Sequence, residues 1–498
     1  MIFNRVLRNL AKPGKNLSER TIKSGFWIFS VRIVQQLFGF VRIIILARVL
    51  APHDFGLMGI ALLMLTILDT FTQTGLHQAL IQKKDDIKIY LDTVWTYLIL
   101  RGVVLFAILY LIAPYVATFF NTPEAKLMVQ VIGFAILLQA FTNIGTIYFQ
   151  KELEFNKLFF YQISITLSDF IVTVSLVFIL KNVWALVFGL IASNLTGCIV
   201  SYIIHPFSPR LSFDLRKVKG LFGFGKWVWS SAVLSFFILQ GDSMFVGKFL
   251  GAAALGFYQM AYKISNLPAT EISHMIAQAT FPAYSKLQDD IYRLREAYLK
   301  VLQLTAFLSF PMAGLIFILA PDFTKIFLGE KWMPMVPAIQ ILVFAGLIRS
   351  IAATTGYIFY AVGKPKINTV WQIVQLSVLA ALIYPFSVKW GITGVSMVVF
   401  FSMFVSGIGF CFKAIKITKC GVKNFVNTII YPLICGIAIV LLILGLKTIM
   451  SIGLLEFIIF ACAGVLAYLI VIYLLDKLFN YKKIQTLIKE SIQLFGSA

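Results

Sequence analysis

Residues 158–180 read LFFYQISITLSDFIVTVSLVFIL, residues 183–204 read VWALVFGLIASNLTGCIVSYII, and only Lys181 and Asn182 separate the two runs. An apolar run of about 20 residues is long enough to cross the roughly 30 Å hydrocarbon core of a bilayer as an α-helix. Similar runs follow one another along the 498 residues, of which 60% are hydrophobic. The sequence therefore predicts an all-α polytopic membrane protein.

Polar breaks divide the chain into about 14 candidate transmembrane helices. They cover residues 24–49, 54–82, 91–117, 125–147, 158–180, 183–204, 220–248, 253–285, 298–320, 333–362, 366–386, 391–412, 425–446 and 453–475. The formal net charge is +22, and Lys and Arg concentrate in alternate loops. This bias predicts that both termini are cytoplasmic, namely the basic amphipathic segment 1–23 and the tail 476–498.

The same distribution argues against a nucleic-acid-binding protein, because such a protein needs one contiguous basic face and no loop offers one. The five cysteines and four histidines are scattered singly, so we expect neither a disulfide framework nor a metal site. Phosphate-binding glycine loops, a nucleophile elbow and a long soluble insert are absent from the sequence. We therefore expect a transporter with no cofactor rather than an enzyme.

The two halves of the chain resemble each other. A shift of 200 residues aligns Trp27 with Trp227 and Gly56 with Gly256, together with several other positions, without a gap. An even number of spans separates the copies, which is typical of parallel transporter repeats with a substrate site between them. We expect two pseudo-symmetric six-helix lobes, 24–204 and 220–412, a cytoplasmic linker at 205–219, and two C-terminal helices within 425–475.

Several stretches carry a resemblance to a known family. They are LARVLAPHDFGLMGIA at 46–61, ILDTFTQTGLHQALIQK at 67–83, QKELEFNK at 150–157, FPAYSKLQDD at 281–290, GEKW at 329–332 and GLIRS at 346–350. They resemble the polysaccharide flippase family, in the colanic-acid-exporter-like branch of the multidrug, oligosaccharidyl-lipid and polysaccharide exporter superfamily. The resemblance implies V-shaped lobes that move an undecaprenyl-pyrophosphate-linked oligosaccharide across the bacterial inner membrane, for exopolysaccharide, capsule or O-antigen assembly.

Charged residues inside the predicted spans are candidates for the substrate site. An Arg at mid-bilayer costs about 3 kcal/mol to insert, so these side chains should face a cavity or a partner rather than lipid. The deep bases are Arg32, Arg42, Arg101, Lys263 and Arg349. The acids are Asp69, Asp169 and Glu271, with Asp242 nearer the outer end. Because the bases outnumber the deep acids, at least one base should lack a carboxylate partner.

Helical spacing arranges these residues in two polar stripes. Arg32, Gln35, Gln36, Gly39 and Arg42 share one face of the first span, and Thr66, Asp69, Gln73 and His77 share one face of the second. One interpretation is an ion pair of Asp69 with Arg32 or Arg42 that only joins helices. The other is a polar cavity that faces the substrate.

Surplus guanidinium groups suit a pyrophosphate, which Arg grips through paired hydrogen bonds. We therefore predict pyrophosphate contacts from Arg349, Arg32, Arg42 and Lys263, with Arg349 facing Arg32 and Arg42 across the cleft. Asp69, Gln36, Gln73, Asp242 and Glu271 are the candidate polar residues of the cavity. A carboxylate among them could couple transport to a proton or a sodium ion. The expected partners are the lipid-linked oligosaccharide and membrane lipids.

Two alternative functions remain open. A multidrug and cation antiporter of the same superfamily usually carries cations, which the basic surplus disfavours, and usually has twelve spans. An integral-membrane glycan polymerase or ligase would be expected to have a large outer loop with catalytic Arg or His. The longest outer loop here, residues 321–333, is too small for that.

Overall fold

The structure, a computed structural model, describes residues 17–73, 75–82, 87–214, 233–267, 280–281, 283–449 and 453–478. Regular secondary structure within these residues is entirely helical. Ten described helices are long and apolar enough to cross a membrane, or eleven if a bent pair forms one span. The predicted all-α polytopic class is confirmed, and the number of spans stays a prediction.

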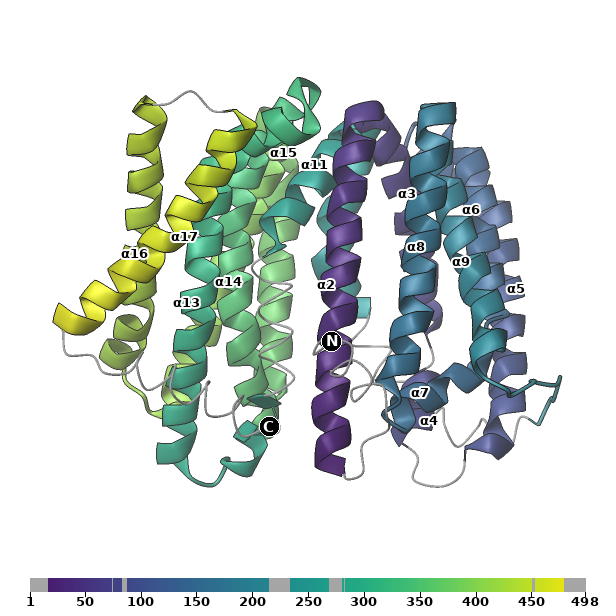
Figure 1. Ribbon diagram of the computed structural model, residues 1–498, viewed down its shortest axis with the longest axis horizontal. Coiled ribbons are helices and arrows are strands. Elements are labelled where there is room, and N and C mark those ends of the chain that lie inside the picture. The colour runs from purple at the N-terminus through teal and green to yellow at the C-terminus, as the bar shows by residue number, and fades with distance from the viewer. Residues whose placement is uncertain are drawn as a thin grey trace, which may run out of the picture. The chain divides into compact units, whose positions relative to one another are not determined.

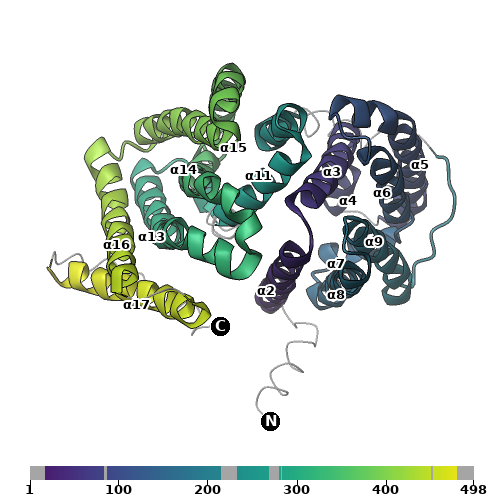
Figure 2. The same ribbon diagram turned by 90° about the horizontal axis from the view of Figure 1, so that it is seen from above.

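The chain divides into two compact units, Met1–Gly256 (unit 1) and Phe257–Ala498 (unit 2). In unit 1, helices pack in the order α5, α6, α9, α8 and α2, as Figures 1 and 2 show. The elements are α2 (Leu17–Val49), α3 (Pro52–Thr72), α4 (Leu76–Gln82), α5 (Lys88–Phe119), α6 (Ala125–Ala140), η1 (Ile144–Thr146), α7 (Ile147–Lys151), α8 (Phe155–Leu180) and α9 (Trp184–Ile204). Residues 233–249 are also helical.

The boundary between the units falls within α11 (Gly251–Ser265). In unit 2, α13 packs against α14, α16 and α17, and α14 packs along α15. The elements are α13 (Ile291–Phe323), η3 (Thr324–Leu328), η4 (Glu330–Met335), α14 (Val336–Ala361), α15 (Lys366–Thr418), α16 (Val422–Ile449) and α17 (Leu454–Leu478). The predicted spans 298–320, 333–362, 425–446 and 453–475 therefore correspond to α13, α14, α16 and α17.

Two predicted spans of unit 1 are interrupted. The span 54–82 is divided between α3 and α4, and Gly75 in the break has φ +69°, a left-handed conformation that glycine adopts most readily. The span 125–147 ends its first helix at Ala140, and the next helical segment turns by 66°. Asn143 stabilises this turn because its side chain accepts a hydrogen bond from the Gly145 amide at 2.9 Å.

The predicted spans 366–386 and 391–412 both lie within α15. Gly391 breaks the helix between them, with φ 56° and ψ −136°, outside the helical region. The left-handed φ explains why glycine occupies this position. The predicted boundary between these two spans therefore coincides with the break in the backbone.

The first half of the predicted linker is tied to unit 1. The Arg210 amide donates to Asp92 at 2.8 Å, and the Ser212 amide donates to Thr96 at 2.9 Å. Both acceptors lie near the start of α5, so residues 205–214 run beside that helix end. Residues 215–232 lie outside the described residues, as do 1–16 and 479–498. The lobe boundaries therefore remain predictions, and the compact units divide later in the chain, at Gly256.

Helices α3 and α11 approach each other closely through two glycines of unit 1. A Cβ atom on Gly56 would lie 1.7 Å from the Ala252 carbonyl oxygen, and one on Gly256 would lie 1.9 Å from the Pro52 carbonyl oxygen. No other residue type fits at either position without separating the backbones. Pro52 and Gly56 are the residues that the 200-residue shift aligns with Ala252 and Gly256.

Hydroxyl groups join α13 to α14 inside unit 2. The three contacts are Ser309 with Ser350 at 2.7 Å, Thr305 with Thr354 at 3.2 Å, and Tyr298 with Thr355 at 3.2 Å. All six residues are at most 1% exposed. Side-chain hydrogen bonds of this kind stabilise contacts between helices in a bilayer. Ser350 directly follows Arg349, so these hydrogen bonds hold the helix that carries Arg349 against α13.

Candidate functional site

The polar stripe of α2 is used largely to join α2 to α8. Arg42 forms an ion pair with Asp169 at 2.5 Å, and these side chains are only 25% and 20% exposed. Two turns before Arg42 in α2, the Gln35 amide donates to the Thr166 hydroxyl of α8 at 3.4 Å. Arg42 is therefore neutralised within unit 1, which weakens its case as a pyrophosphate contact. The partner of Arg42 is thus Asp169 and not Asp69, the acid considered for it from the sequence.

Two other residues of the stripe are placed differently. Arg32 is half-buried, and no described residue forms a hydrogen bond or ion pair with it. Gln36 is exposed on the same helix. Of the two arginines predicted on α2, Arg32 is therefore the one that keeps an uncompensated charge within the described part of the chain.

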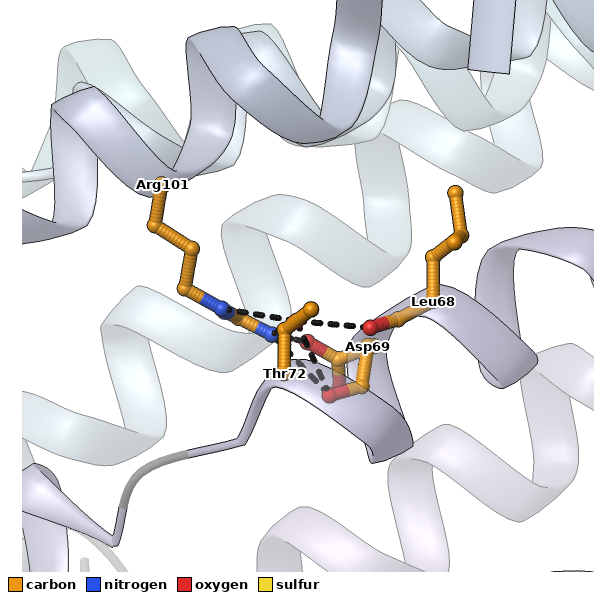
Figure 3. A network of polar contacts seen from close by, with 4 residues as sticks. All are labelled: Leu68, Asp69, Thr72 and Arg101. Atoms are coloured by element: carbon orange, nitrogen blue, oxygen red, sulfur yellow. Dashed lines mark hydrogen bonds and ion pairs between the residues drawn. The ribbon is translucent and has the colours of Figure 1, made fainter. Parts of the chain in front are cut away.

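Asp69 lies in a polar network at the end of α3, shown in Figure 3. The Arg101 Nη2 atom of α5 lies 2.6 Å from Asp69 Oδ1, and it also donates to the Asp69 carbonyl oxygen at 3.0 Å. Arg101 Nε donates to the Thr72 hydroxyl at 3.0 Å, and Thr72 in turn donates to the Leu68 carbonyl oxygen at 2.6 Å. The interpretation that Asp69 pairs with Arg32 or Arg42 is therefore wrong.

This network lines a cavity of about 520 Å³ within unit 1. Residues of α3, α5, α6 and α8 and of the turn after α6 meet around it, including Thr66, Gln139, Thr142 and Tyr161. The Arg101 side chain is 19% exposed, whereas the Asp69 side chain is 63% exposed. Gln73, which we had predicted at the cavity, is half-buried at the C-terminal cap of α3 and does not line it.

Arg349 of α14 occupies a contrasting environment in unit 2. Its Nη1 donates to the Asn266 side-chain oxygen at 3.1 Å, and its guanidinium carbon lies 5.2 Å from the centre of the Tyr262 ring. Nη2 lies 3.8 Å from the Met403 sulfur. Within the described residues no carboxylate contacts it. A guanidinium carries five N–H donors, so several remain for a ligand.

The other predicted site residues are Lys263, Asp242 and Glu271, and the first two do not line the cavity of unit 1. Lys263 is exposed in the last turn of α11. Asp242 is 2% exposed, and its Oδ1 accepts from the Ser243 amide at 2.6 Å. Glu271 lies outside the described residues. Arg349 belongs to unit 2, whereas Arg32 and Arg42 belong to unit 1, so the placement of Arg349 opposite them stays a prediction.

Arg101 lines the cavity but was not assigned to the site from sequence. Arg101 had been identified only as a deep base, since nothing in its own span marks it as a partner of Asp69. The available signal was its position within about 3 Å of the span centre, which requires a partner or a cavity. The structure supplies both, the partner being Asp69.

Comparison with known sequences gives three results. The sequence profile of a family described as "Polysaccharide biosynthesis protein" matches residues 45–337. The chain is 26% identical to the lipopolysaccharide biosynthesis protein WzxC of Escherichia coli strain K12, over 71% of this chain and 72% of that protein. It is 29% identical to the teichuronic acid biosynthesis protein TuaB of Bacillus subtilis strain 168, over 60% and 62% of the two chains.

Among solved structures, the fold is similar to that of the lipid II flippase MurJ in an inward closed conformation. The TM-score is 0.70, and the similarity covers 92% of this chain and 99% of that chain at 16% sequence identity. At this level of identity the likeness concerns the fold alone.

Proposed function

Because the chain belongs to the polysaccharide biosynthesis protein family, we propose that it flips undecaprenyl-pyrophosphate-linked oligosaccharides across the bacterial inner membrane by alternating access. The protein is a multi-pass membrane transporter of polysaccharide biosynthesis and not an enzyme. The proposal adds the lipid carrier, the direction from the inner to the outer leaflet and the cytoplasmic location of both termini. A glycan polymerase or ligase is thereby set aside.

Arg349 is the observation that favours a pyrophosphate-linked cargo. Its half-buried guanidinium has neutral neighbours, Asn266, Tyr262 and Met403, and no carboxylate among the described residues contacts it. A positive charge with free donors in a poorly solvated environment attracts an anion strongly. A diphosphate offers several oxygens that a planar guanidinium can contact in pairs. We assign Arg349 as the main headgroup contact.

Arg32 is the second headgroup contact that we propose, since it is half-buried and no described residue pairs with it. Lys263 is exposed and could reach a phosphate through its flexible stem. Arg42 is the weakest of the four predicted contacts, because Asp169 already neutralises it. Coupling to a proton or a sodium ion through Asp242 or Glu271 belongs to the same proposal.

Export by variants of Arg349 tests the proposal. In a strain that lacks the endogenous gene, Arg349→Ala should abolish the appearance of the glycan at the cell surface. Arg349→Lys should impair it, because the lysine keeps the charge and loses the planar fork of donors. Arg293→Ala is the matched control, since this arginine is 74% exposed at the start of α13. Immunoblotting of membranes establishes that each variant is inserted and abundant.

Normal export by an abundant Arg349→Ala protein would rule out the headgroup assignment. Accumulation of the lipid-linked oligosaccharide in the inner leaflet of the Arg349→Ala strain would support the proposal directly. Extracted lipid-linked sugars, analysed by mass spectrometry, would also identify the carrier lipid and its diphosphate.

A further inference from the structure

The cavity of unit 1 differs chemically from the surroundings of Arg349. Asp69 and Arg101 are the carboxylate and the guanidinium of its lining, and these neutralise each other; the imidazole of His77 also lines it. A diphosphate would gain little at such a site, because its negative charge would meet the Asp69 carboxylate as closely as the Arg101 guanidinium. The cavity is therefore better suited to an uncharged ligand with many hydroxyl groups.

The ion pair leaves one acceptor atom on Asp69 and one donor atom on Arg101 without a bond from a described residue. Arg101 uses Nε and Nη2 for its bonds to Thr72 and Asp69, and within the described residues nothing bonds to its Nη1. Asp69 uses Oδ1 for the ion pair, and no bond from a described residue reaches its Oδ2. Figure 3 shows the two groups converging from separate helices. Neighbouring hydroxyls of a sugar, which both donate and accept, match this arrangement.

The rest of the lining fits the same ligand. Thr66, Gln139 and Thr142 contribute neutral polar groups, and Tyr161 contributes an aromatic ring against which the apolar face of a sugar can lie. The volume of about 520 Å³ lies within the range of about 300–1,000 Å³ that small-molecule sites occupy.

We propose that this cavity binds a neutral pyranose ring of the transported glycan, with Asp69 accepting hydrogen bonds from its hydroxyls and Arg101 donating one. The inference rests on the proposed function and adds a selective step to it. A uronic acid is disfavoured at this position, because its carboxylate would face the free oxygen of Asp69 in a site without net positive charge.

Saturation-transfer difference NMR on the full-length protein in detergent micelles tests this inference. The probes are the methyl glycosides of glucose, galactose, mannose and fucose, with methyl glucuronide as the acidic counterpart of the glucoside. At least one neutral glycoside should give a signal, and methyl glucuronide should give none. Asp69→Asn should reduce the neutral signal at least about fivefold, because the amide has lost the charged acceptor.

The matched control is Glu124→Gln, which makes the same chemical change at an exposed residue that does not line the cavity, and its signal should be unchanged. If Asp69→Asn does not fold, Gln139→Leu carries the test, since Gln139 is exposed on α6 and lines the cavity. Absence of every neutral signal, equal binding of methyl glucuronide, or a signal that survives the substitution would each overturn the inference.

The two proposals can fail separately. Arg349 does not line this cavity, so the Arg349→Ala protein should bind the neutral probes as the wild type does. If the probes bind but Arg349→Ala exports normally, the headgroup assignment fails and the sugar site stands. If the probes do not bind but Arg349→Ala abolishes export, the reverse holds.

Discussion

Arg42 and Arg101 of unit 1 and Arg349 of unit 2 lie inside apolar helical bundles in different ways. In unit 1, Arg42 and Arg101 each contact a carboxylate, on Asp169 and Asp69. In unit 2, Arg349 contacts an amide, a thioether and an aromatic ring, and hydroxyl pairs join its helix to α13. An arginine that already has a counter-ion serves mainly to hold helices together. One with only neutral contacts keeps its charge available for a ligand.

Replacement of Arg42 should have the largest effect on stability. Arg42→Met removes one member of a poorly exposed ion pair and takes the guanidinium away from the Asp169 carboxylate, which costs about 3 kcal/mol. A fluorescence thermal-shift measurement in detergent should show a clearly lower midpoint. The double variant Arg42→Met with Asp169→Leu should recover much of the loss, because both charges of the pair are then absent. An unchanged midpoint in the single variant would show that the pair contributes little.

The same replacement in unit 2 should have a smaller effect on stability. Arg349→Met leaves no carboxylate behind among the described residues, and it loses one hydrogen bond and one cation–π contact, together worth about 1 kcal/mol. The thermal midpoint should therefore fall less than for Arg42→Met, although export should be lost. A drop as large as that of Arg42→Met would contradict the distinction between the two units.

The hydroxyl pairs of unit 2 should contribute least individually. A side-chain hydrogen bond between membrane helices is worth about 0.6 kcal/mol on average. Ser309→Ala, Ser350→Ala and the double variant form a double-mutant cycle whose coupling free energy should be near this value. A coupling several times larger would mean that the neutral pairs hold unit 2 together as firmly as the ion pairs hold unit 1.

Sequence reasoning identified the faces of helices better than their partners. The spacing of Gln35 and Arg42 predicted a common face, and both side chains contact α8. It could not identify α8 as the neighbour, because Thr166 lies 131 residues from Gln35 in the chain. Asp69 was likewise assigned the wrong partners, since the choice among deep bases depends on how distant helices pack.

Arg349 shows what can be inferred from an absence within one helix. No acid lies within one turn of it in the sequence, and among the described residues none contacts it in the fold. Its neutral neighbours were beyond prediction, because Asn266 is 83 residues away. The break within the predicted span 54–82 was missed for a different reason. The average hydropathy of the span is high, and it concealed the turn signal TQTG at residues 72–75.

The crossing of α3 and α11 has a consequence for the origin of the chain. Gly56 lies against Ala252, and Gly256 lies against Pro52. The 200-residue shift relates Gly56 to Gly256 and Pro52 to Ala252, so it converts one contact into the other. Such a self-complementary contact is the kind that two identical chains form about a two-fold axis. An ancestor of half the length could therefore have dimerised through this surface before gene duplication joined the copies. In that ancestor a single mutation at the glycine would have struck both sides of the interface, whereas after fusion each side could change alone.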